Sequence, residues 1–157
     1  MTQQEEFFKK NQYAIILGCV GTKIFPSVKA AQAALETGYG KYPTKGNNFF
    51  GIKATGSHTP YWTGESTAEN TREVIDGKEI SINTGFRKYA TMADSIKDHT
   101  YLLTSKSRYA PVLAANTPED QARALQTCGY ATDPNYATSL IWIINKYNLK
   151  ELDKKKS

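Results

Sequence analysis

The sequence feature that most constrains the fold is an alanine-rich segment between a proline and two glycines. Four of the nine residues at 28–36 are alanine, the residue with the highest helix propensity. Pro26 stands in the expected first turn, where a missing N–H group costs nothing, and Gly38 and Gly40 follow as stop signals. Because the side chains are small, neighbouring elements can pack close to this segment. It predicts a tightly packed helix from Pro26 to Glu36.

The N-terminal segment could be a structural helix or a secretion signal. Two lysines precede the short apolar stretch at residues 13–20, but Glu5 and Glu6 lie where a signal would be positive. The apolar residues recur at helical spacing, so we expect a structural first helix over about residues 5–22. No run approaches the roughly 20 apolar residues of a membrane span, and none is predicted.

A small β lobe is predicted in the middle of the chain. Asp76-Gly77 is a strong signal for a two-residue hairpin turn, and it follows a loop-like region rich in glycine and proline. In the register that this turn sets, Glu73 lies opposite Ile80. The β-prone segments on either side of the turn predict two short strands, residues 71–75 and 78–82.

Three further helices are predicted after the hairpin, each from a capping signal at its start. The starts are Thr91 with Asp94, Thr117 before Pro118, and Asp133 before Pro134. The sum is an α+β, mainly helical class with one small β-hairpin lobe. We expect a single domain over residues 1–150 and a polar, basic tail over residues 151–157.

The composition favours a polyanionic partner without identifying it. The formal net charge is +5 and the pI is near 9.1, which suits nucleic acid, a Gram-positive wall or the peptide carboxylates of peptidoglycan. The chain lacks a recognisable basic recognition helix or aromatic sheet motif, so nucleic acid is not expected as a partner. Cys19 and Cys128 are expected to be free thiols rather than a disulfide.

Metal and nucleophile chemistry find little support in the sequence. His58 and His99 are isolated and show no ligand spacing. The glycines near residue 20 lack the lysine and hydroxyl residue of a phosphate-binding loop. We therefore expect no metal and no cofactor.

Glu36 is the residue that points most directly to chemistry. It lies in the last turn of the alanine-rich helix, where the negative end of the helix dipole disfavours a charged carboxylate. Partial burial acts in the same direction, so both effects raise its pKa. A general acid near neutral pH needs such a shift. The alternative is an ordinary surface glutamate near a helix end.

Several blocks of residues resemble the bacterial endo-β-N-acetylglucosaminidase family of glycoside hydrolases, which includes the peptidoglycan-hydrolase domain of the flagellar rod protein. The resemblance covers almost the whole chain, from about Phe7 to Leu149, and its first and last blocks are the most specific. In order, the blocks are residues 31–41, 47–53, 86–89, 108–110 and 129–137.

The resemblance implies a lysozyme-like fold and hydrolysis of the β-1,4 bond between N-acetylglucosamine and N-acetylmuramic acid. It implies that Glu36 is the general acid and that a second carboxylate stands just before the hairpin turn. Glu73 is the best match, with Glu69 and Glu65 as alternatives because the preceding loop varies in length. Tyr130, in the last block, is expected to hydrogen-bond the acetamido group or a catalytic water.

Aromatic side chains are expected to stack on the flat faces of sugar rings, as they do on other apolar surfaces. Two or three of six candidates should touch sugar: Tyr39, Phe50, Tyr61, Trp62, Tyr109 and Tyr136. Asp133 is expected to cap the last helix rather than take part in chemistry. Cys128 replaces the small residue usual in the family and is given no catalytic role.

Other functions stay open at this stage. A muramidase of similar shape would leave a different sugar at the new reducing end, and a lytic transglycosylase would leave an anhydro product. A non-catalytic wall-binding module would release no product. A retaining, an inverting and a substrate-assisted mechanism all remain compatible with these residues. We expect a monomer that acts on peptidoglycan at the bacterial cell wall, in the periplasm or outside the cell. Delivery by phage lysis, by a virion or by a secretion system, with a cognate immunity protein if the chain is a toxin, would fit.

Overall fold

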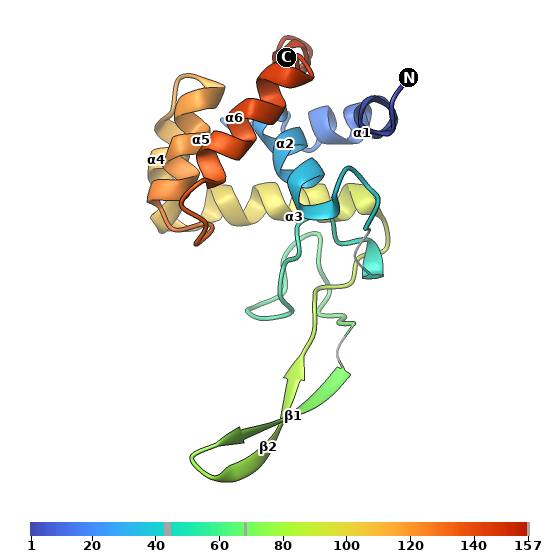
Figure 1. The fold of residues 1–157 in the computed structure, drawn as a ribbon, viewed down its shortest axis with the longest axis vertical. Coiled ribbons are helices and arrows are strands. Elements are labelled where there is room, and N and C mark those ends of the chain that lie inside the picture. Colours follow the sequence, from blue (N-terminus) through green and yellow to red (C-terminus); the bar gives the residue numbers. More distant parts are fainter. Residues whose placement is uncertain (43–44, 68, 157) are drawn as a thin grey trace.

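The computed structural model describes residues 1–42, 45–67 and 69–156, and within the hairpin it describes side chains only at positions 74 and 76–79. A helical body stands above a long two-stranded hairpin (Figure 1). The helices and strands are α1 Gln3–Leu17, α2 Pro26–Thr37, β1 Glu69–Ile75, β2 Lys78–Thr84, α3 Met92–Ser105, α4 Ala110–Ala114, α5 Pro118–Thr127, α6 Tyr136–Lys146 and α7 Lys150–Asp153. Single 3₁₀ turns occur at Lys45–Asn47 and Ser107–Tyr109.

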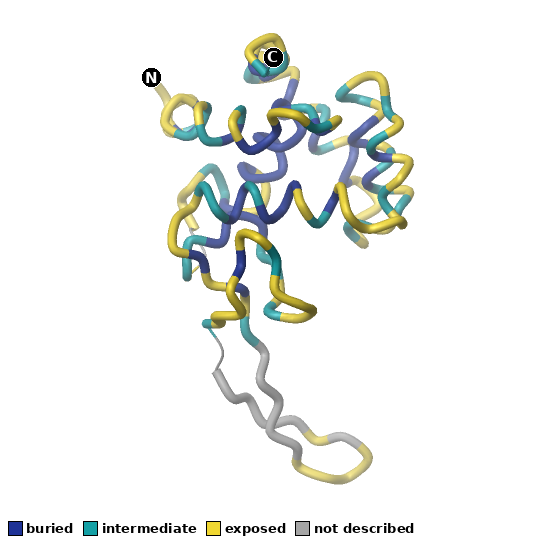
Figure 2. The backbone as a smooth tube through the Cα atoms, turned by 180° about the vertical axis from the view of Figure 1, so that it is seen from behind, coloured by how far each residue is buried: buried dark blue, intermediate teal, exposed yellow. Residues whose placement is uncertain are grey.

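Helix α2 is the centre of the body. Every residue from Pro26 to Ala34 is buried, and the helix packs against α1, α5, α6 and α7. Figure 2 shows this buried stretch running through the middle of the fold. Pro26 is the first helical residue, and Gly38 ends the helix with a left-handed φ of 57°. The prediction from the alanine-rich segment is confirmed.

Helix α1 is part of the core rather than a separable leader. A capping box between Thr2 and Glu5 starts it, and Phe7, Phe8 and Ile15 are buried. It ends before Gly18, earlier than the sequence pattern suggested. A Cβ at Gly18 would lie 2.5 Å from the Ile96 side chain, because α1 and α3 approach closely at this glycine.

The hairpin has the predicted turn and register. Asp76 and Gly77 both have positive φ, 52° and 75°, as a type I′ turn requires. Glu73 pairs with Ile80 in an antiparallel ladder. Val74, near the tip, is 73% exposed. The two strands project away from the helical body (Figure 1).

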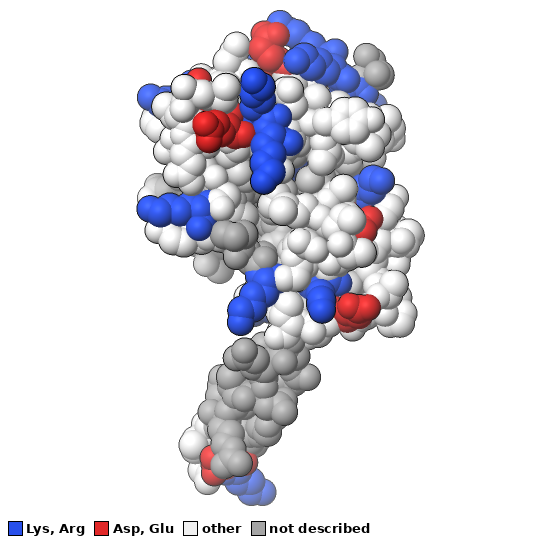
Figure 3. Space-filling model, turned by 90° about the vertical axis from the view of Figure 1, so that its right-hand side faces the viewer, with Lys and Arg blue, Asp and Glu red and all other residues white. Residues whose placement is uncertain are grey.

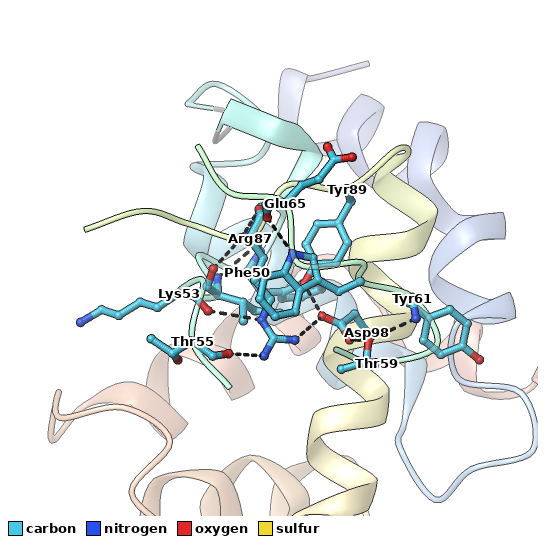
Figure 4. Close-up of polar contacts among 12 residues, drawn as sticks. Phe50, Lys53, Thr55, Thr59, Tyr61, Glu65, Arg87, Tyr89 and Asp98 are labelled. Carbon is cyan, nitrogen blue, oxygen red and sulfur yellow. Dashed lines mark hydrogen bonds and ion pairs between the residues drawn. The ribbon is translucent and has the colours of Figure 1, made fainter. Parts of the chain in front are cut away.

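A buried polar cluster around Asp98 of α3 fixes the base of the hairpin (Figure 4). The Arg87 guanidinium donates to the Asp98 carboxylate at 3.0 Å and to the Thr55 carbonyl at 2.6 Å. The hydroxyls of Tyr89 and Thr59 also donate to Asp98, the latter at 2.5 Å. Because Thr55 and Thr59 precede the hairpin and Arg87 and Tyr89 follow it, one carboxylate ties both ends of the lobe to α3. We call these five residues the Asp98 cluster.

The capping signals at Thr91 and Thr117 are confirmed, since each hydroxyl accepts from the backbone N–H three residues later. The last long helix begins at Tyr136, later than expected. Asp133 does not cap it: its carboxylate accepts from the Asn135 N–H at 2.8 Å, in a turn that leads into the helix. The short helices α4 and α7 were not predicted.

The expected polar tail needs a correction for residues 151–156. Leu152 of α7 is buried, and Asp153 accepts from the Ser27 N–H at 2.8 Å and from its hydroxyl at 2.7 Å. The Lys156 ammonium donates to the Thr22 carbonyl at 2.7 Å. These contacts make α7 a cover over the start of α2 rather than a solvated extension.

The charges on the face in Figure 3 are dispersed, with lysines and arginines spread among uncharged atoms. Across the part of the chain that the structure describes, none of the helices has the length and apolar character that crossing a membrane requires. Both cysteines are free thiols; Cys19 is buried and Cys128 is half-buried.

Candidate active site

A cleft of about 340 Å³ opens where the C-terminal end of α2 meets α3 and the start of α6. The loop after α2, the 3₁₀ turn before α4 and the loop after α5 complete its walls. It brings together residues that are far apart in the sequence: Glu36, Phe50, His99, Tyr109, Tyr130 and Tyr136.

Glu36 lies in the last turn of α2, at the edge of this cleft. The residue is exposed as a whole, but its carboxyl is packed against the backbone of Gly51. A Cβ at Gly51 would collide with the Glu36 Oε1 atom and lie 3.3 Å from Cδ. This desolvation raises the pKa of the Glu36 carboxyl above its ordinary value. The group is therefore suited to hold a proton and release it.

Tyr130 is joined to a chain of buried polar groups. Its hydroxyl lies 2.7 Å from Nε2 of His99, and Nδ1 of His99 is in a short contact with Nζ of Lys29. The His99 ring stacks on Phe50 at 3.9 Å between centroids, with 11° between the planes. The chain runs from the middle of α2, through α3, to the cleft wall.

Lys29 is the largest fully buried side chain of the described residues. Desolvation lowers the pKa of its ammonium to about 7. Among the described residues no carboxylate pairs with Lys29; its neighbours are His99, the Phe50 ring at 5.3 Å and the Cys19 thiol. Burial, followed by the Lys29 charge, lowers the pKa of His99 well below its ordinary value, so the imidazole is neutral.

The remaining aromatic wall is ordered by stacking and one hydrogen bond. The Tyr130 and Tyr136 rings stack at 5.7 Å, and Tyr109 lies 6.2 Å from Tyr130. The Gln32 amide donates to the Tyr136 hydroxyl at 3.0 Å. Burial is the main cause that raises the pKa of Tyr130 and of Tyr136, and the nearby Glu36 carboxylate acts in the same direction. Both phenols therefore keep their protons.

Three of the six aromatic candidates, Phe50, Tyr109 and Tyr136, line the cleft, and the other three lie outside it. Trp62 is 4% exposed, and the Arg87 guanidinium lies 4.0 Å from its ring centroid, so its stacking surface is occupied. Tyr61 faces a separate hollow and contacts Tyr101. Tyr39 packs between Phe8 and Tyr147 as part of the aromatic core.

The second carboxylate is less well defined. The side chains of Glu73 and Glu69 lie outside the described residues, and only their backbone positions on β1 are known. Glu65 is exposed, and its carboxylate points away from the Asp98 cluster (Figure 4). The backbone of Glu65 accepts from the Trp62 indole N–H at 2.8 Å.

Sequence reasoning missed Lys29 and His99. His99 appeared isolated because its partners are distant in the sequence; Lys29 lies 70 positions before it. One signal was present: a lysine inside a helix of small apolar residues needs a buried partner. Across residues 1–42, 45–67 and 69–156, the described side chains form no group of three or more metal-ligating residues.

The chain is similar to known proteins over most of its length. The glucosaminidase family model, described as mannosyl-glycoprotein endo-beta-N-acetylglucosaminidase, matches residues 16–149. Exo-glucosaminidase LytG of Bacillus subtilis is 40% identical over 137 residues, which is 83% of this chain and 46% of LytG. Peptidoglycan hydrolase FlgJ of Salmonella typhimurium is 41% identical over 133 residues, covering 81% of this chain and 40% of FlgJ. The chain thus spans less than half the length of these relatives.

The fold has close counterparts among solved structures. The catalytic domain of the autolysin Auto from Listeria monocytogenes superimposes with a TM-score of 0.78 at 33% identity, covering 98% of this chain and 89% of that one. The family match extends from the end of α1 to the residue before α7, so it includes every wall of the cleft. This chain belongs to the glucosaminidase family of glycoside hydrolases.

Proposed function

We propose that this protein is a peptidoglycan hydrolase that cuts the β-1,4 bond between N-acetylglucosamine and N-acetylmuramic acid, with Glu36 as the general acid. The observation that carries the proposal is the position of Glu36. Its carboxyl stands at the edge of a cleft, is desolvated against Gly51 and has a raised pKa. A carboxylic acid that protonates a leaving glycosidic oxygen needs these properties.

The walls of the cleft suit a sugar. Phe50, Tyr109, Tyr130 and Tyr136 supply apolar ring faces, while the tyrosine hydroxyls supply polar contacts that can orient the ligand. The names of LytG and FlgJ describe a glucosaminidase and a peptidoglycan hydrolase, which supports the same substrate class.

In the proposed reaction, Glu36 gives its proton to the glycosidic oxygen as the bond to the anomeric carbon breaks. A water molecule then completes hydrolysis at that carbon. We assign Glu73 the task of deprotonating or positioning this water. The strands project away from the body in Figure 1, so this role requires the hairpin to bend toward the cleft when a glycan strand binds.

The test is the chemistry of the cut ends. Purified bacterial walls are digested, the products are reduced with borohydride, and the reduced sugars are identified by mass spectrometry. Reduced N-acetylglucosamine is expected. Reduced N-acetylmuramic acid would identify a muramidase and an anhydro sugar a transglycosylase, and either would overturn the proposed bond. Lengths of the early products separate internal cleavage, which we propose, from release of single units at chain ends.

The place of action that follows is the bacterial cell wall. The proposed partner is the glycan strand, and the protein is proposed to act as a monomer. A cognate immunity protein enters the proposal only for delivery as a toxin, and it would then have to cover the cleft at Glu36. Lysis of a wall suspension by the purified protein, scored by turbidity, separates this enzyme from a wall-binding module.

A further inference from the structure

The hydrogen-bond chain from Lys29 through His99 to Tyr130 has a direction that depends on one proton. An ammonium group has donors and no acceptor, and a neutral imidazole has one of each. When Lys29 is charged, it must donate to Nδ1 of His99. The remaining His99 proton is then on Nε2 and is donated to the Tyr130 oxygen at 2.7 Å. The Tyr130 hydroxyl proton cannot then be donated to His99, and it points to the cleft.

Removal of the Lys29 proton allows the opposite direction. A neutral amine has a lone pair, so it can accept from an Nδ1–H of His99. Nε2 then accepts from the Tyr130 hydroxyl, and only oxygen lone pairs are left to face the cleft. The heavy atoms need not move between the two states. The difference is whether Tyr130 offers the cleft a donor or an acceptor.

We propose that Lys29 and His99 are positioning residues, which together compel Tyr130 to donate its hydroxyl proton into the cleft, to the acetamido carbonyl oxygen of the substrate. This inference rests on the proposed function for its ligand, but the direction of the chain is a property of the free protein. An amide carbonyl is an acceptor only, so it is bound by the donor form of Tyr130 and rejected by the other form.

The groups that surround the Lys29–His99–Tyr130 hydrogen-bond chain leave the proton of Lys29 as the one that sets its direction. From the segment after α1, the Cys19 thiol faces Lys29, and burial raises the pKa of that thiol, so it stays neutral. From the cleft side, Glu36, Tyr109 and Tyr136 face Tyr130. A charged Glu36 would attract the Tyr130 proton and so would favour the donor form as well.

The direct test is the tautomer of His99, read from the ¹⁵N shifts and long-range proton couplings of the imidazole. The chain contains two histidines, so His58→Gln assigns the signals. In the wild-type protein, below the Lys29 pKa of about 7, a proton on Nε2 and a bare Nδ1 are expected. The signals should move toward the other tautomer as the pH rises through that value, and should be mixed at all pH values in Lys29→Met. A proton on Nδ1 in the wild type at low pH overturns the proposal.

The second test is a double-mutant cycle on the rate of release of reducing ends from purified walls. Tyr130→Phe should lower kcat by about tenfold, the value of one hydrogen bond, and Lys29→Met should lower it by less, because its mixed His99 tautomers leave part of the protein in the donor form. The double variant should be no slower than Tyr130→Phe alone, because Lys29 acts only through that hydroxyl. A further loss in the double variant contradicts the proposal.

Thr100→Val is the matched control. Thr100 is buried beside His99 on α3 but lies outside the cleft, so its isosteric replacement should leave the rate unchanged. If Lys29→Met does not fold, the wild-type tautomer alone decides. The two proposals also fail separately: an active Glu36→Gln protein refutes the assigned general acid and leaves the His99 tautomer untouched.

Discussion

The backbone of Gly51 touches the carboxylate of Glu36, and this contact leaves no room for a side chain at position 51. Gly51 also has a φ of 61°, in the left-handed region that glycine adopts most easily. The residue that is proposed to donate the proton is therefore held in place by a residue without a side chain.

Gly51→Ala should lower activity by about 10²-fold, because displacing a catalytic group by about 1 Å has that effect. An alanine at position 51 would have to adopt the left-handed backbone conformation, which should also lower the free energy of unfolding by about 1–2 kcal/mol. Gly21→Ala is the matched control: it has a φ of 77° and open space around the added methyl. It should show the stability loss and keep its activity, measured by thermal melting and wall lysis. Equal rates for the two variants would disprove the steric argument.

Glu36→Gln should lose about 10²–10⁴-fold in rate while it keeps the wild-type melting temperature, because the amide preserves the shape and removes the acidic proton. Turnover is measured as reducing ends released from purified walls, with pull-down on insoluble walls to confirm binding. A folded Glu36→Gln protein that lyses walls at the wild-type rate would exclude Glu36 as the acid.

The pH profile should show a basic limb set by Glu36, with a further loss above the Lys29 pKa of about 7, where the donor form of Tyr130 is depleted. The acid works only when protonated, and its pKa is raised above 4.5, so kcat/KM should hold below that raised value and fall as the pH rises through it. The measurement runs from about pH 4 to about pH 9 on one wall preparation. A rate that climbs with pH across this range would show that the ionised carboxylate is the active form.

Glu73→Gln should lower kcat with little change in wall binding, because the proposed contact with water matters mainly in the transition state. Glu69→Gln and Glu65→Gln are the controls on the same lobe. Loss of activity in a control, with Glu73→Gln active, would move the role to that residue. Full activity in all three would leave Glu36 to work with Tyr130 or the substrate acetamido group, against our assignment.

Lys29 should make stability depend on pH. The unfolded lysine holds its proton to about 10.5, while the folded one releases it near 7, so between these values unfolding takes up a proton. The penalty for a buried charge is complete below pH 7 and is relieved above it. The unfolding free energy of wild type relative to Lys29→Met should therefore rise, by at most about 1.4 kcal/mol per pH unit. Urea titrations along this range measure it, and a flat difference would mean that Lys29 keeps its proton in the fold up to about 10.5.

The sequence predicted features that rest on local chemistry. Pro26 begins α2 because it lacks a backbone N–H group, and Gly38 ends the helix through its positive φ. Asp76 and Gly77 set the hairpin register in the same way, through their own backbone angles. Glu36 was singled out for the same reason, since the end of a helix and its dipole are local properties, while its role as the general acid rests on the family resemblance and stays a proposal.

The sequence failed where the answer depends on what a side chain faces. Trp62 is the kind of side chain that stacks on a sugar ring, but the Arg87 guanidinium covers its indole. The sequence analysis took His99 as isolated and did not single out Lys29, because the contact between them joins α2 to α3 across 70 positions of the sequence. Leu152 anchors a short helix that is held by tertiary contacts rather than by its own propensity.

Asp98 and His99 are consecutive residues of α3 that serve different parts of the molecule. Asp98 holds the base of the hairpin through Arg87, and His99 holds the Tyr130 hydroxyl. A helix turns as one rigid rod, so a twist of α3 that loosened one contact would strain the other. The base of the hairpin and the wall of the cleft are therefore attached to the same helix. If a glycan strand displaced the hairpin, the contact between His99 and the Tyr130 hydroxyl would be strained as well.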